Sequence, residues 1–81
     1  MIEEIVKQIE RLSTEPGLPK NVRQALQNAK EELLNEEKEL PVRISSAVYE
    51  LEKTIDEPNL MQHTRIALLQ IISTLESIRD Q

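Results

Sequence analysis

The stretch Glu15-Pro16-x-Leu18-x4-Arg23-x-Ala25-Leu26 returns 42 positions later as Glu57-Pro58-x-Leu60-x4-Arg65-x-Ala67-Leu68. The match needs no gap, and it extends beyond this stretch, so that ten identities fall within the 39 overlapped positions. A repeat of about 40 residues has the length of two helices of about four turns joined by a turn. The chain is therefore predicted to contain two copies of one helical hairpin, in units 1–39 and 43–81.

Apolar residues recur at intervals of three and four within each unit, the spacing that places them on one face of a helix. Proline, glycine and polar runs interrupt this pattern and separate predicted helices over residues 2–12, 19–33, 41–55 and 64–78. Short connectors make sequential helices antiparallel neighbours. The predicted fold class is all-α, an up-and-down four-helix bundle made of two αα-hairpins, as a single domain of residues 1–81. Its predicted inner faces carry Ile2, Ile5, Val6, Ile9, Leu12, Val22, Ala25, Leu26, Ala29, Leu33, Ile44, Ala47, Val48, Leu51, Ile55, Thr64, Leu68, Ile71, Ile72, Leu75 and Ile78.

Composition restricts the compartment and the partners. The chain has no cysteine, which fits a reducing cytoplasm, and its opening residues Met1-Ile2-Glu3-Glu4 resemble neither a signal peptide nor a membrane span. A net charge of −5 repels nucleic-acid backbones at long range. We therefore expect a cytoplasmic protein with no membrane partner and no general affinity for nucleic acid. Self-association would add burial to a core limited by the small size of the chain.

Few residues could carry catalysis or hold a cofactor. The chain has one histidine, no cysteine and no glycine-rich phosphate loop. The paired Glu-x-x-His motifs of di-iron bundles are absent, which argues against a di-metal site. His63 is expected to be solvated or to lie at a helix start. We predict no catalytic, cofactor or metal site and no enzymatic activity. One acidic run lacks the pattern of a calcium loop and is interpreted as a solvated connector: Glu31, Glu32, Glu36, Glu37 and Glu39.

Three arginines lie near predicted helix starts, where the helix macrodipole disfavours a cation: Arg23, Arg43 and Arg65. Arg23 and Arg65 are repeat mates, and each follows a glutamate of its turn by eight residues. A guanidinium folded back onto the turn would explain both, and removal of either should then lower stability by a similar amount. The functional alternative is an anion site at this end of the bundle, made by Lys20, Arg23, His63 and Arg65.

The two repeats differ most on the outward side of the last helix. Gln24 is replaced by Ile66 and Gln27 by Leu69 in the repeat alignment. The third predicted helix has Val42 and Tyr49 on the side opposite its core face. These four residues, Val42, Tyr49, Ile66 and Leu69, are a candidate interface with a second copy or with another protein. The alternative is that the last helix is enclosed within its own bundle, or that long Lys and Glu side chains cover the patch.

Several short stretches together are similar to a known group of sequences: Pro19-Lys20-Asn21-Val22-Arg23, Leu33-Leu34-Asn35-Glu36, Val42-Arg43-Ile44-Ser45, Glu57-Pro58-Asn59, His63-Thr64-Arg65 and Leu75-Glu76-Ser77. With them the chain resembles the archaeal uncharacterised protein family 0147 over nearly its whole length. The resemblance implies a four-helix bundle in an archaeal cytoplasm. It implies no activity, because the family has none assigned.

Two hypotheses about function follow from these observations. The first is a non-enzymatic protein-interaction or self-associating structural module that uses the apolar residues of the last two helices. The second is an accessory protein that binds an anionic ligand, RNA or a nucleotide phosphate, at the Arg23 and Arg65 end.

Overall fold

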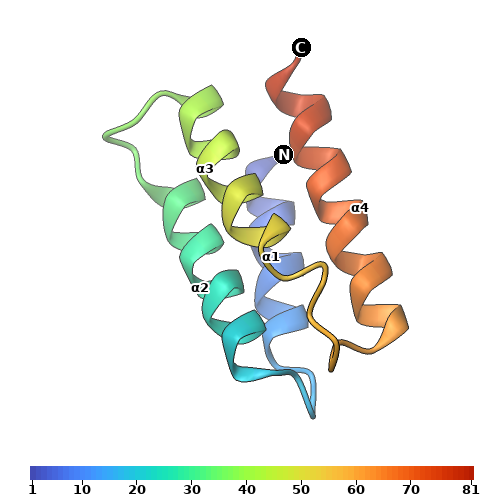
Figure 1. The fold of residues 1–81 in the computed structure, drawn as a ribbon. Helices are drawn as coiled ribbons and strands as arrows, with labels where there is room; N and C mark the ends of the chain where they lie inside the picture. The colour runs from blue at the N-terminus through green and yellow to red at the C-terminus, as the bar shows by residue number, and fades with distance from the viewer.

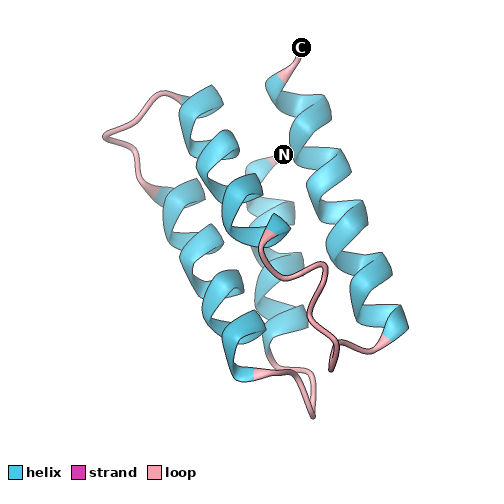
Figure 2. Cartoon of the chain, in the orientation of Figure 1, coloured by secondary structure: helices cyan, strands magenta, loops and turns pink.

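Four helices and no strand make up the computed structural model, which describes residues 1–81 (Figures 1 and 2). They alternate in direction, and both chain termini lie at the end of the bundle opposite the α1–α2 and α3–α4 connections (Figure 1). This confirms the predicted all-α, up-and-down arrangement. The helices are α1 (Ile2–Ser13), α2 (Lys20–Leu34), α3 (Leu40–Glu52) and α4 (Gln62–Arg79).

The third helix is shorter than its periodicity predicted, because it ends at Glu52 and does not reach Ile55. The amide of Thr54 bonds to the carbonyl of Leu51, three residues back, and the Thr54 hydroxyl donates to the same oxygen at 2.7 Å. These bonds tighten the chain into a turn. Ile55 still packs against the core from this turn, which explains why it matched the apolar pattern.

The core is formed almost wholly by branched aliphatic side chains, as the composition requires. Of the predicted inner-face residues, four at helix or turn ends are only partly buried: Ile2, Leu12, Ile55 and Ile78. Leu18 and Leu60, repeat mates in the two equivalent turns, are buried as well and were not predicted. Gly17, with a φ of +78°, adopts the left-handed conformation that the first of these turns needs. The turns therefore close one end of the core.

Packing between neighbouring helices is unequal, and α2 and α3 share the most extensive contact. Their facing sides carry the buried alanines Ala25, Ala29 and Ala47, which allow the two backbones to approach closely. The amide of Asn28 donates to Glu50 at 3.1 Å across the same seam. This hydrogen bond lowers the pKa of the Glu50 carboxyl.

The α1–α4 seam is the repeat equivalent of the α2–α3 seam, but it is much more open. Two of the alanines are replaced there by isoleucine, since Ala47 corresponds to Ile5 and Ala29 to Ile71. The larger side chains fill the core between α1 and α4 and keep the helices apart. A groove therefore runs along this side of the bundle.

Candidate functional site

Each connection between helices is closed by an arginine from the helix that follows it. Arg23, Arg43 and Arg65 are the fourth residues of α2, α3 and α4. Each guanidinium turns back and donates to backbone carbonyl oxygens of the preceding segment, which offsets the unfavourable position of a cation near a helix start. The nitrogen–oxygen distances are 3.0 Å for Arg23–Ser13, 3.3 Å for Arg23–Glu15, 2.7 Å for Arg43–Lys38, 2.9 Å for Arg65–Ile55 and 3.1 Å for Arg65–Glu57.

The predicted fold-back of Arg23 and Arg65 onto their turns is thus present, with different acceptors. The guanidinium groups bind main-chain oxygens, including those of Glu15 and Glu57, and not the carboxylates of these residues. Ser13 is the last residue of α1, and carbonyls at a helix end lack intrahelical partners. The carbonyls of Glu15 and Glu57 also accept backbone bonds from Leu18 and Leu60, so the arginines add a second bond to these turns.

The residues of the predicted anion site all lie at one end of the bundle, at the starts of α2 and α4 (Figure 1). Arg23 and Arg65 are already bonded to carbonyl oxygens, and His63 is bonded to Glu15. Lys20 is exposed and makes no hydrogen bond or ion pair within the chain. An anion at this end would have to compete with existing contacts, and anion binding there stays a prediction.

Arg65→Ala should lower the free energy of unfolding by about 1–2 kcal/mol, because it removes two bonds to carbonyls from a partly buried position. Arg23→Ala should cost less, since Arg23 is exposed and one of its two bonds is 3.3 Å long. The repeat alone predicts equal losses of stability for the two variants, whereas the contacts in the structure predict a larger loss for Arg65→Ala. Urea denaturation of both variants measures the difference. The control is Arg11→Ala, which removes an exposed arginine without side-chain hydrogen bonds, and a loss as large as that of Arg65→Ala would contradict the assignment.

The carboxylate of Glu15 joins the two hairpins at the same end of the bundle. The hydroxyl of Thr64 donates to its Oε2 at 2.7 Å, and Nε2 of His63 lies 2.7 Å from its Oε1. Helix α4 has no acidic residue in its first turn and no side-chain cap of its own. Glu15, from the α1–α2 turn, therefore supplies the negative charge that a helix start favours.

Sequence reasoning missed this contact, because the partners are 48 and 49 residues apart. The one available signal was the difference between the repeats: His63 and Thr64 stand where the first unit has Asn21 and Val22. Thr64 is buried, and its bond to Glu15 satisfies its hydroxyl.

Stability should depend on pH through Glu15. The hydrogen bonds from Thr64 and then from His63 lower its pKa below the ordinary value of 4.5, although partial burial opposes them. A carboxyl with a lowered pKa stabilises the fold above its unfolded-state pKa, and this contribution disappears as the pH falls through the folded-state value. Glu15→Gln should therefore unfold more easily than the native chain at pH 6, by about 1 kcal/mol, and the difference should shrink below about pH 4.

Urea denaturation at several pH values measures this effect, with Glu36→Gln as the control. Glu36 is exposed and its side chain makes no hydrogen bond, so this variant should follow the native chain throughout. If Glu15→Gln remained less stable than the native chain by the same amount in acid, the carboxylate would not be the stabilising species.

The four residues of the predicted interface are all exposed in the single chain. We call them the outer apolar face: Val42 and Tyr49 on α3, 51% and 64% exposed, and Ile66 and Leu69 on α4, each 47% exposed. Enclosure within the bundle therefore does not account for Ile66 and Leu69. The Lys53 ammonium lies 4.7 Å from the centre of the Tyr49 ring and also pairs with Glu50 at 3.1 Å. The ring of Tyr49 is thus the one part of this face that has a charged partner, which lies over the ring as in a cation–π contact.

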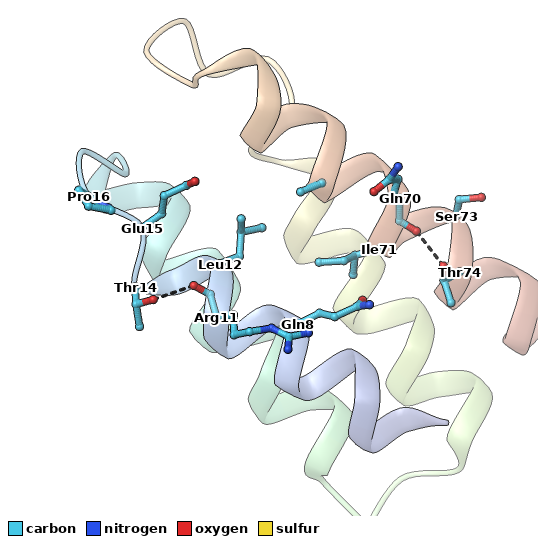
Figure 3. Close-up of a pocket in the computed structure, with 11 residues that line it drawn as sticks. Gln8, Arg11, Leu12, Thr14, Glu15, Pro16, Gln70, Ile71, Ser73 and Thr74 are labelled. Atoms are coloured by element: carbon cyan, nitrogen blue, oxygen red, sulfur yellow. Dashed lines mark hydrogen bonds between the residues drawn. The ribbon is translucent and has the colours of Figure 1, made fainter.

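The groove between α1 and α4 has a volume of about 790 Å³ (Figure 3). Its apolar lining comes from Leu12, Ala67 and Ile71, while Gln8 and Gln70 lie on its two sides. These glutamines are the repeat mates of Glu50 and Asn28, which bond to each other across the α2–α3 seam. Figure 3 shows side chains of α1 facing those of α4 across the opening, with the hydroxyl of Thr74 bonded back to its own helix. No set of three His, Cys, Asp or Glu side chains is placed to hold a metal ion, here or elsewhere in residues 1–81.

Comparison with known proteins shows the family. Residues 1–78 match the model of an uncharacterised protein family, UPF0147. The chain is a member of UPF0147. A UPF0147 protein of Pyrococcus horikoshii is 35% identical over 79 residues, which cover 96% of this chain and 85% of the relative. A UPF0147 protein of Methanopyrus kandleri is 36% identical over 72 residues, which cover 89% of this chain and 69% of the relative.

Two crystal structures share the fold of this UPF0147 member. One is of MMP1188, a protein of unknown function, with a TM-score of 0.89 and 37% identity, over 94% of this chain and 86% of that chain. The other is of a UPF0147 protein from Thermoplasma acidophilum, with a TM-score of 0.87 and 33% identity, over 94% of this chain and 89% of that chain. None of the four helices combines the length and hydrophobicity needed to cross a membrane.

Proposed function

We propose that this UPF0147 protein is a non-enzymatic association module of the cytoplasm, which binds protein through its outer apolar face. The observation that carries the proposal is the exposure of Val42, Tyr49, Ile66 and Leu69 on two neighbouring helices of one chain. Scattered apolar residues are ordinary on a protein surface, whereas a group of large ones is typical of an interaction site.

The internal repeat supports this proposal because it offers a matched comparison. Gln24 and Gln27 occupy the positions of α2 that Ile66 and Leu69 occupy in α4, and all four side chains are exposed. The fold therefore accepts polar residues at these positions. Ile66 and Leu69 lie outside the core of the single chain, with about half of each side chain exposed, and they would contribute to burial against a partner.

The distribution of charge on α4 supports the same face. Residues 66–75 contain no charged side chain, although 31% of the chain is charged. On the exposed side that carries Ile66 and Leu69, α4 has Ser73 where α2 has the charged Glu31. Depletion of charge is a property of the buried centre of protein interfaces.

A non-enzymatic role fits the environment of the titratable groups. The two carboxyl groups with lowered pKa, Glu15 and Glu50, are both held in hydrogen bonds that connect helices. The single histidine is bonded to Glu15. The hydrogen bonds of Glu15, Glu50 and His63 give these side chains a structural role. We assign none of the three as a catalytic base.

The test is affinity capture from a lysate of the source cell with the native chain and two variants. The double variant Ile66→Gln with Leu69→Gln gives α4 the residues of α2 at these positions. The control Leu34→Gln changes a large apolar residue that is 53% exposed at the end of α2. Proteins that bind the native chain and Leu34→Gln, but not the double variant, would support the proposal, and a second copy of this chain from the lysate counts among them. Equal capture by all three chains would contradict it.

A further inference from the structure

We infer that the partner of the outer apolar face is a second copy of this chain, with α4 packed antiparallel against α4 of the copy. This inference rests on the proposed function and adds the identity of the partner and the geometry of the contact. The exposed side of α4 is the part of this face best suited to a second copy, because that helix carries the uncharged segment 66–75.

The exposed side of α4 carries a stripe suited to helix packing. Ile66, Leu69 and Ser73 follow one another at intervals of three and four, and Gln62 and Glu76 extend the same spacing at either end. Residues at this alternating spacing lie along one side of a helix, as in the contact stripe of a coiled coil. The side chains of the three central residues are exposed in the single chain.

This stripe is complementary to itself in size. If a two-fold axis passes beside Leu69, the second copy runs antiparallel to the first. Ser73 of the second copy then lies opposite Ile66 of the first copy, and Ile66 of the second lies opposite Ser73 of the first. A large side chain then meets a small one at both symmetric positions, and Leu69 meets its own symmetry mate. Such an isologous contact is closed, because it uses the same patch on both chains. Gln62 of each copy would then lie opposite Glu76 of the other, and its amide nitrogen could donate to that carboxylate while its Oε1 keeps the bond from Arg65.

Charge also favours this face for a second copy. Each chain carries a net charge of −5, so two copies repel each other least where the surfaces that meet carry few charges. Residues 66–75 are the longest uncharged run in the sequence. Two α4 helices facing each other bring these runs together and keep the acidic α2–α3 connection away from the contact.

A stable dimer also needs a contact of sufficient area. A standard interface buries about 800 Å² on each partner. The whole chain exposes 5105 Å², and its longest sides measure 33 by 20 Å. Helix α3 packs beside α4, where its Ser45 accepts a bond from Arg79 at 3.4 Å, and its Val42 and Tyr49 are exposed. An interface of standard size would cover about a sixth of the surface of each chain, and we expect it to extend from α4 onto Val42 and Tyr49.

Cysteine cross-linking tests the geometry directly, because the chain has no cysteine of its own. In Leu69→Cys the two sulfur atoms of a dimer would lie beside the two-fold axis, within reach of a disulfide. This variant should convert to a covalent dimer under mild oxidation at low protein concentration. The control Leu34→Cys, at a position slightly more exposed than Leu69 but outside the contact, should remain largely uncross-linked. A mixture of Ile66→Cys with Ser73→Cys should give more covalent dimer than either variant alone.

Light scattering of the native chain supplies the second measurement. The expected mass is twice the 9.4 kDa of one chain, falling to 9.4 kDa for Ile66→Gln with Leu69→Gln, with helical content retained by circular dichroism. A native mass of 9.4 kDa at all concentrations would overturn the inference, while selective loss of captured proteins by the same double variant would still support the proposed function. A dimer in which Leu69→Cys and Leu34→Cys cross-link equally would overturn the α4–α4 geometry. If the double variant lost its helical content, its mass would say nothing about the contact. The cross-linking of Leu69→Cys compared with Leu34→Cys would then decide whether α4 packs against α4.

Discussion

Leu68→Ala is expected to lower the free energy of unfolding by about 2–5 kcal/mol, the range for a fully buried leucine in a closely packed core. Leu68 has no exposed surface and lies on the core side of α4. A protein of 81 residues is stabilised by roughly 4–12 kcal/mol in total, so this single change should remove a large fraction of its stability. Urea denaturation followed by circular dichroism, at one fixed protein concentration, measures the loss.

Two further variants make this result interpretable. Leu26→Ala, at the repeat mate of Leu68 and equally buried, should give a comparable loss. Leu34→Ala truncates an exposed leucine and should change stability by less than about 0.5 kcal/mol. If Leu68→Ala unfolded at the same urea concentration as Leu34→Ala, the core would not be closed around α4 in solution.

Ala29→Ile should destabilise the protein by about 1–3 kcal/mol, although it introduces the residue that stands at the equivalent position, Ile71. Ala29 has no exposed surface and lies in the close seam between α2 and α3. The added methyl and methylene groups have no space unless the helices separate. Separation would also disturb the bond between Asn28 and Glu50.

The matched control for this overpacking is Ala67→Ile. Ala67 lines the open groove between α1 and α4, where added volume meets solvent and not a neighbouring backbone. This variant should change stability by much less than Ala29→Ile in the same denaturation experiment. Equal losses would mean that the two seams are equally tight in solution and that the groove closes.

Most of the fold could be predicted because the sequence contains two copies of the same helical hairpin. The repeat gave the number of helices, and the three-and-four spacing of residues such as Ile44 and Leu68 identified the side of each helix that is buried. The burial of Leu18 and Leu60 could not be found in this way, because both lie in turns and have no helical periodicity. The end of α3 was wrong by three residues, since apolar spacing continues through Ile55 while the hydrogen bonding changes at Thr54.

The candidate site could be predicted only where one repeat serves as a reference for the other. Comparison of Ile66 and Leu69 with Gln24 and Gln27 identified exposed positions correctly, because equivalent positions of a repeat share their environment. No such reference exists for contacts between the repeats. The link from Glu15 to Thr64 depends on how the two hairpins meet, and the openness of the α1–α4 seam depends on the summed volumes of side chains from both.

The arginine at the fourth position of each helix has a consequence for the order in which the chain folds. Arg43 reaches a carbonyl five residues back, and Arg23 and Arg65 reach carbonyls eight and ten residues back. Contacts so close in sequence require little loop-closure entropy, and they can form as soon as the first turn of the following helix is in place. The Glu15–Thr64 bond spans 49 residues and must wait until both hairpins have docked. We therefore expect the connections to be ordered in the folding transition state, and the link between the hairpins to be among the last contacts made.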